Sequence, residues 1–66
     1  MRIRFDADAD AFYIRLDESA IVESEEVRPG IILNFNDADE VVSVEILRVQ
    51  HRLPEADLTR LNLEAA

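Results

Sequence analysis

The sequence predicts an α+β fold, an antiparallel β-meander of four to five strands with a short C-terminal helix packed on one face. Three observations support this prediction. Apolar and polar residues alternate in several short runs, which is the period of a half-buried strand. The runs are joined by short polar connections, whereas parallel neighbours need crossovers of a dozen residues or more. Near the C-terminus the apolar spacing changes to that of a helix.

The first two strands are expected at residues 1–5 and 12–16, on either side of the acidic segment 6–10. Both runs alternate strictly, so every second side chain shares one face of the sheet. The other face receives arginines and a tyrosine. The side chains expected on the core face are Ile3, Phe5, Phe12, Ile14 and Leu16.

A third strand is expected over residues 20–27, in one of two registers. Strict alternation places Val22, Ser24 and Glu26 on one face and leaves Val27 on the other, whereas a β-bulge at Glu25-Glu26 turns Val22, Ser24 and Val27 towards the core. Pro29-Gly30 then forms a tight turn, because proline fixes φ at its first corner and glycine accepts a positive φ at the second. The fourth and fifth strands follow at 31–35 and 41–47, separated by the polar turn 36–40.

The C-terminal helix is expected over residues 54–61. Pro54 suits the first helical position, acids follow in the first turn, and Leu58 and Leu61 share a face at i, i+3 spacing. We expect residues 1–61 to form one small domain and residues 62–66 to fray as a tail. The apolar stripe of the helix would cover one face of the sheet.

Composition narrows the classes of function. Fifteen carboxylates against seven arginines give a net charge of −8, which disfavours nucleic-acid binding. The absence of cysteine excludes disulfides and thiolate metal sites. No apolar run approaches the roughly 18 residues that cross a bilayer, so no membrane association is expected and the cytoplasm is the expected location. A chain this short needs help to be stable, and self-association is the remaining means.

The chain resembles the YuzE-like family of small prokaryotic domains over about residues 1–53. The resemblance rests on Asp6 and on the segments 10–16, 26–33 and 44–47, in that order and spacing. The family has no established activity to carry over. Some members look like the acidic half of gene pairs of the toxin–antitoxin kind, which implies a basic protein partner. The family commonly has glycine where this chain has Ser43.

The strongest candidate for a metal site is Asp6, Asp8 and Asp10, which have the spacing that opens a calcium loop. An EF-hand loop also needs glycine at its sixth position and glutamate at its twelfth, where this chain has Ala11 and Asp17. A hairpin loop whose aspartates accept backbone hydrogen bonds explains the pattern better. We therefore assign no metal and keep these three residues only as weak candidates.

No catalytic constellation is visible, and we expect neither enzymatic activity nor a cofactor. His51 is the only histidine and no nucleophile or orienting group accompanies it in the sequence. The acidic loop at Asp37, Asp39 and Glu40 is expected at the opposite end of the sheet from Asp6, beside Asp17-Glu18. Carboxylates at opposite ends do not form an acid–base pair.

The second face of the sheet is the better candidate for function. Tyrosine, arginine and branched aliphatic side chains together are typical of a protein interface. A solvated charged face with surface ion pairs is the alternative explanation. The interface candidates are Tyr13, Arg15, Ile32, Val41 and Glu45.

Three functional hypotheses follow, and we rank them from the best supported to the least supported by the sequence. The first is an acidic protein-binding module that self-associates as a dimer or larger homo-oligomer, with an antitoxin-like partnership with a basic protein as one form. The second is a purely structural homo-oligomeric domain. The third is a metal-binding or enzymatic protein that uses the loop of Asp6, Asp8 and Asp10.

Overall fold

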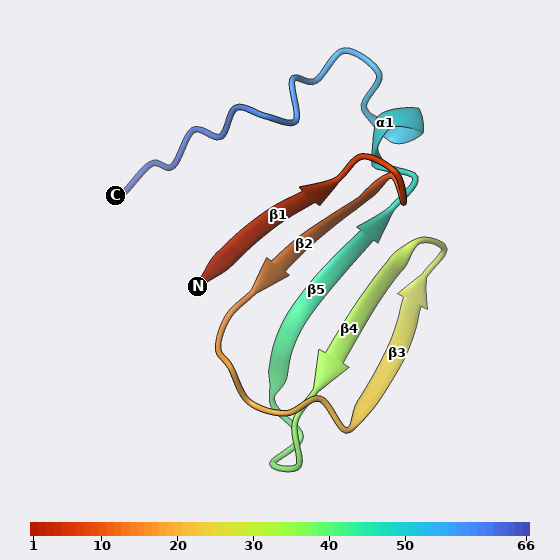
Figure 1. Cartoon of the computed structure of the whole chain (residues 1–66). Coiled ribbons are helices and arrows are strands. Elements are labelled where there is room, and N and C mark those ends of the chain that lie inside the picture. Colours follow the sequence, from red (N-terminus) through yellow and green to blue (C-terminus); the bar gives the residue numbers. More distant parts are fainter.

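The computed structural model describes all 66 residues, Met1–Ala66, as one five-stranded antiparallel sheet with a single short helix (Figure 1). The strand order across the sheet is β1-β2-β5-β4-β3. Their bounds are β1 Arg2–Asp6, β2 Ala11–Arg15, β3 Glu23–Arg28, β4 Ile31–Phe35 and β5 Val41–Leu47, and the helix is α1 Val49–Arg52. The fourth and fifth strands lie where the alternation predicts them.

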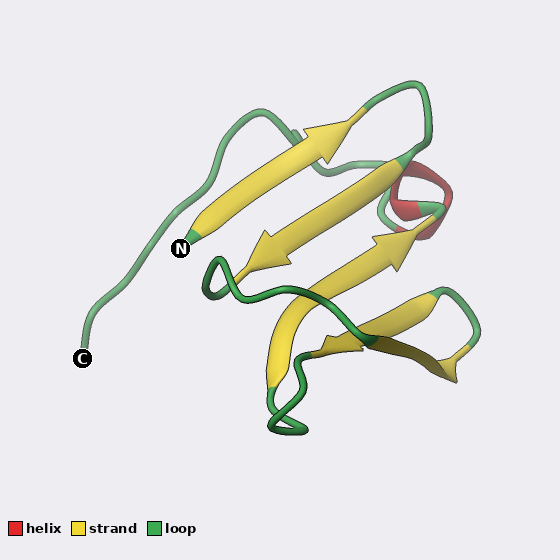
Figure 2. Cartoon of the chain, turned by 60° about the horizontal axis from the view of Figure 1, so that its bottom comes forward, coloured by secondary structure: helices red, strands yellow, loops and turns green.

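The strand order corrects the predicted meander, because β2 pairs with β5 and not with β3. Residues 16–22 do not form a tight turn followed by a strand. They run across the end of the sheet and carry the chain from one side of β5 to the far edge, as Figure 2 shows. The backbone N–H of Val22 donates to the carbonyl of Phe35, 2.8 Å away, and fastens this connection to the end of β4. Ala20 to Val22 therefore belong to a crossing segment.

Two irregularities of register set which side chains share a face. The bulge predicted at Glu25-Glu26 lies further along, between Glu26 and Arg28, opposite Ile31. Ser24 consequently faces the same side as Asn34, and not the apolar side that was predicted. A second bulge separates Asn34 from Phe35, and Phe35 pairs with Val41.

The helix predicted over residues 54–61 is absent, and the only helix is α1, four residues long. Helix α1 ends at Arg52, because the ring of Pro54 disfavours helical backbone at the preceding residue, Leu53. Further on, the carboxylate of Asp57 accepts hydrogen bonds from the N–H and hydroxyl of Thr59, which offers the backbone a local alternative to helix. No helix of this chain has the length and apolar character to cross a membrane.

The end of β5 is joined to α1 by a residue in the left-handed region, Arg48, with φ 52° and ψ 41°. The conformation is held on both sides by backbone hydrogen bonds. The N–H of Leu47 donates to the carbonyl of Gly30 at 2.8 Å, and the N–H of Val49 donates to the carbonyl of Asp10 at 3.2 Å. Val49 is buried, so α1 is anchored at the end of the sheet by its first residue.

The molecule is a single layer with a small core. Seven of the 66 residues are buried, and the apolar side chains among them are those of Ala11, Val42 and Val49. The segment after α1 lies against the sheet at one corner, where Phe5 lines a cleft with Leu53, Leu58 and their neighbours. Beyond that corner the chain runs extended to its C-terminus past β1 (Figure 2), so most of the sheet has no second layer.

Replacing Arg48 with glycine is expected to raise the free energy of unfolding by about 1 kcal/mol. Left-handed backbone destabilises a residue with a Cβ by about 1–2 kcal/mol, and glycine escapes that penalty. Urea denaturation of Arg48→Gly beside Arg48→Ala isolates the backbone effect, because alanine loses the same side chain but keeps the Cβ. Equal midpoints for the two variants would contradict the assignment of strain to Arg48.

Candidate functional site

The face of the sheet that carries Tyr13 and Arg15, here called the polar face, holds a buried hydrogen-bond network centred on Asn34. The side-chain amide of Asn34 donates to the hydroxyl of Ser43 at 2.8 Å and to the carboxylate of Glu45 at 2.9 Å. Its oxygen accepts from the hydroxyl of Ser24 at 2.5 Å. Asn34 and Ser43 are 3% and 5% exposed. Every buried polar side-chain atom has a partner, as a stable polar network requires.

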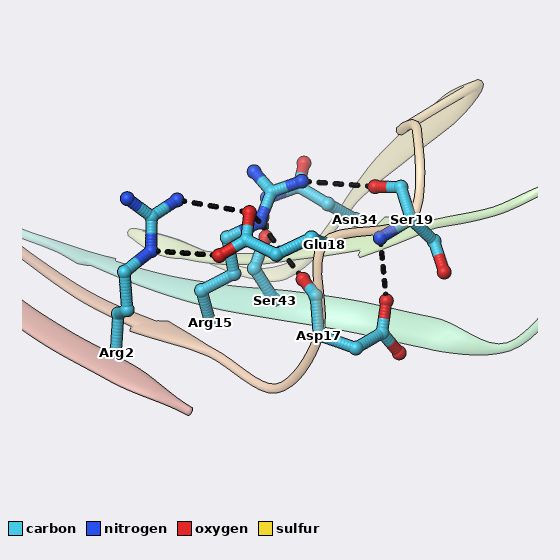
Figure 3. A network of polar contacts seen from close by, with 7 residues as sticks. All are labelled: Arg2, Arg15, Asp17, Glu18, Ser19, Asn34 and Ser43. Carbon is cyan, nitrogen blue, oxygen red and sulfur yellow. Dashed lines mark hydrogen bonds and ion pairs between the residues drawn. The ribbon is translucent and has the colours of Figure 1, made fainter.

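The crossing segment 16–22 is held to the polar face by Arg15 (Figure 3). The guanidinium of Arg15 donates to the carbonyls of Asp17 and Ser19, both at 2.9 Å. Glu18 then bridges the neighbouring strands β1 and β2, with its carboxylate 3.0 Å from Nε of Arg2 and 3.4 Å from Nε of Arg15. Arg2 and Arg15 of the polar face therefore hold this connection in place.

The hydrogen bonds within this segment change the pKa of one of its carboxyl groups, Asp17. Hydrogen bonds from Ser19, first from its side chain and then from its backbone N–H, lower the pKa of Asp17, and the nearby charge of Arg15 acts in the same direction. A lowered pKa in the folded state means that ionised Asp17 supports folding above its ordinary range and loses that effect as the pH falls through the lowered value. The group is fully exposed, so this support is slight.

The opposite face, here called the apolar face, is built from two rows of side chains in register across the strands. The alternation of each strand places these side chains together, and none of the eight is buried. Ile3 is 42% exposed, because it lies on the edge strand β1. The rows are Ile3, Ile14, Val44 and Leu33, and then Phe5, Phe12, Ile46 and Ile31.

At the β3 edge this face becomes acidic. The exposed carboxylate of Glu25 extends the first row, because Glu25 pairs with Leu33, and the exposed Glu23 pairs with Phe35 beyond that row. Charged residues on an edge strand oppose pairing with the edge of another sheet. The face has an apolar centre and a charged border along β3.

The structure brings together four of the five residues predicted from the sequence as an interface. Tyr13, Glu45 and Ile32 occupy one row of the register, and Arg15 lies two residues along from Tyr13 on the same face. Val41 stands apart, because it lies beyond the bulge and pairs with Phe35. Sequence reasoning did not identify the hub of this face, Asn34, although an asparagine between apolar residues of a strand is unusual enough to mark it.

The acidic loop of Asp6, Asp8 and Asp10 is organised by backbone hydrogen bonds. The carboxylate of Asp6 accepts from the N–H groups of Asp8 and Ala9, both at 3.1 Å. Asp10 instead accepts from the N–H of Gln50 at 2.9 Å, which ties the loop to α1. No group of three or more histidine, aspartate or glutamate side chains is placed to hold a metal ion.

The remaining sequence candidates lie far from one another. The turn 36–40 is organised by Asn36, whose side-chain oxygen accepts from the N–H groups of Ala38 and Glu40, both at 3.0 Å. This turn and Asp17-Glu18 lie at the opposite end of the sheet from Asp6, as predicted. His51 lies on α1 and is exposed, at the end of the sheet away from the turn 36–40 and from Asp17-Glu18.

Asn34→Ala is expected to lower the free energy of unfolding by about 2 kcal/mol, because the buried hydroxyl of Ser43 and the carboxylate of Glu45 lose their donor. Thermal unfolding checks this, with a fall in Tm of roughly 8 °C or more for a domain of this size. Asn62→Ala in the exposed tail is the matched control and should leave Tm unchanged. An unchanged Tm for Asn34→Ala would show that the network does not hold the polar face.

Comparison with protein families gives one match, to the family described as "Protein of unknown function (DUF2283)", over residues 2–50. The matched range contains all five strands and the start of α1. Comparison with curated proteins and with solved structures gives no match. The resemblance to a small-domain family of unknown function is thereby confirmed. This chain belongs to the DUF2283 family.

Proposed function

We propose that this chain is a protein-binding module that associates with a second copy of itself through the apolar face. The supporting observation is that two rows of aliphatic and aromatic side chains lie side by side with no second layer over most of them. Contiguous apolar patches of this kind mark interaction sites in soluble proteins. The polar face is a poorer candidate, since Arg2 and Arg15 already hold the crossing segment there.

The dimensions of the face support a second copy as its partner. Five strands about 4.8 Å apart, each about five residues long, cover roughly 20 by 17 Å. Two such faces present roughly 700 Å² in projection, and more as accessible surface because side chains project from them. Stable interfaces begin at about 1,200 Å² in total. Pairing two identical faces thus approaches this range without any further element.

The chemistry of the face also favours self-pairing. Two antiparallel sheets pack face to face at about 10 Å with their strands nearly aligned, and their inward side chains interdigitate. A two-fold arrangement places the same aliphatic rows on both sides of the interface. The carboxylates of Glu23 and Glu25 then lie at the border, where interfaces are polar and wet. A chain with so few buried residues gains in this way the core that it lacks alone.

Ile14→Glu is expected to weaken the dimer by about 30-fold or more, because each copy would place a carboxylate in the desolvated centre of the interface. Sedimentation equilibrium measures the dissociation constant, and circular dichroism verifies that the variant keeps its strands. The matched control is Ile32→Glu, the same exchange on β4 with the side chain on the polar face. Its dissociation constant should stay close to that of the unmodified chain.

Two results would overturn the proposal. The unmodified chain could sediment as a monomer at every concentration, which would exclude self-association. Alternatively, Ile32→Glu could dissociate the dimer while Ile14→Glu leaves it intact. The second outcome would assign the interface to the polar face, around Tyr13 and Glu45, as the sequence suggested. It would also leave the apolar face without a role in assembly.

A basic protein is a second candidate partner, and one observation favours it. Glu23, Glu25 and Glu26 on the edge strand β3 are all exposed, and none takes part in an ion pair. A row of free carboxylates along one edge attracts a cationic partner over long range, and the attraction weakens with salt. An antitoxin-like pairing with a basic protein would use this edge.

Gel filtration with a purified basic protein encoded beside the gene for this chain tests the pairing. Co-elution at low salt is expected, and the triple exchange of Glu23, Glu25 and Glu26 to glutamine should abolish it. Glu64→Gln in the exposed tail serves as the control and should co-elute as before. Separate elution of the unmodified chain from every such neighbour would remove this candidate.

A further inference from the structure

A pocket of about 330 Å³ lies between the turn that joins β3 to β4 and the start of α1. Both segments lie at the same end of the sheet (Figure 1). Neither the sequence hypotheses nor the apolar face makes use of it. Its volume is at the lower end of the range for small-molecule sites. The lining residues are Pro29, Leu47, Arg48, His51 and Arg52.

The lining is basic in a strongly acidic chain. Two guanidinium groups and the only imidazole lie within five consecutive residues, while the whole chain carries a net charge of −8. All three ion pairs of the structure involve Arg2, Arg4 or Arg15. Arg48 and Arg52 therefore have no carboxylate within ion-pairing distance, which leaves their donors available to a ligand.

Arg48 is positioned by the fold itself. Its guanidinium lies over the turn, with Nη2 3.6 Å from the place that a Cβ on Gly30 would occupy. Gly30 is buried with φ 80°, so the turn that supports Arg48 has little freedom to change. The left-handed backbone of Arg48 is a strained conformation, and such strain in folded proteins gathers at functional sites.

We propose that this pocket binds the phosphate group of a small molecule. Guanidinium groups present donors in a planar fork that matches the oxygens of phosphate, and such charge-assisted hydrogen bonds are the strongest in proteins. Leu47 and Pro29 supply an apolar wall for the remainder of the ligand. The pocket has room for more than a phosphate ion alone.

The charge of the surroundings selects for a compact ligand. The loop of Asp6, Asp8 and Asp10 lies at the same end of the sheet and is joined to α1 through Asp10. The carboxylates of this loop repel an extended polyanion such as nucleic acid, whose binding depends on many basic contacts. A single phosphate group carries far less charge than a polyanion, and its attraction to two arginines opposes the remaining repulsion. The site lies at the end of the sheet, so it does not depend on dimerisation through the apolar face.

Titration with inorganic phosphate, against sodium chloride at equal ionic strength, tests the proposal. Backbone amide chemical shifts of Arg28, Gly30 and residues 47–52 should move and saturate with phosphate and not with chloride. Arg48→Gln and Arg52→Gln should each weaken binding about tenfold, because each removes a charge-assisted hydrogen bond. Arg60→Gln, in the tail and outside the pocket, is the matched control and should bind as the unmodified chain does.

A second arm separates the two sources of phosphate. If glycerol 3-phosphate saturates the same amides at lower concentration than inorganic phosphate, the ligand is a phosphorylated small molecule. Equal concentrations indicate that free phosphate is the ligand. Arg48→Gly guards against a misfolded variant, since it should fold at least as stably as the unmodified chain and yet lose binding. Linear, unsaturated shifts with phosphate, or equal binding by the Arg48→Gln and Arg60→Gln variants, would overturn the proposal.

Discussion

Burial of one apolar sheet face is the constraint on which the rest of this molecule depends. A sheet with aliphatic side chains on one side is stable in water only when another layer covers that side. Here residues 53–59 reach only the corner at Phe5, and Ala11, Val42 and Val49 make up the buried apolar core. The chain therefore combines a complete hydrogen-bonded sheet with an incomplete hydrophobic core. Self-association is the proposal that resolves this imbalance with the fewest additional parts.

The polar face is stabilised in a different way. Asn34 connects three strands through Ser24, Ser43 and Glu45, and Arg15 holds the crossing segment over the same region. Such a network specifies register, because each partner must stand opposite its donor. A one-residue slip of β4 would turn Asn34 to the apolar face and bury an unsatisfied amide. The polar face thus fixes the register of the strands, and the apolar face remains available for a partner.

The two ends of the sheet differ as well. One end collects carboxylates in the turns at 17–18 and 37–40, while the other carries the arginines of the β5–α1 junction beside the loop of Asp6 to Asp10. This separation of charge within an acidic chain gives each end its own electrostatic character. The proposed phosphate pocket uses the arginines of the β5–α1 junction, whereas the proposed basic partner uses the carboxylates of the β3 edge. They are consequently separate questions for experiment.

The sequence by itself determined the local elements. Strict alternation identified β1 and β2, apolar runs between polar turns identified β4 and β5, and Pro29-Gly30 identified the turn between β3 and β4. Strand periodicity and turn chemistry are encoded within a few neighbouring residues. Only the tertiary structure decided the pairing of β2 with β5, the position of the bulge before Arg28 and the fate of residues 54–61. The first two depend on contacts between residues far apart in the chain, for which alternation carries no information. The third depends on packing, because a short helix forms in water only when another element buries its apolar side.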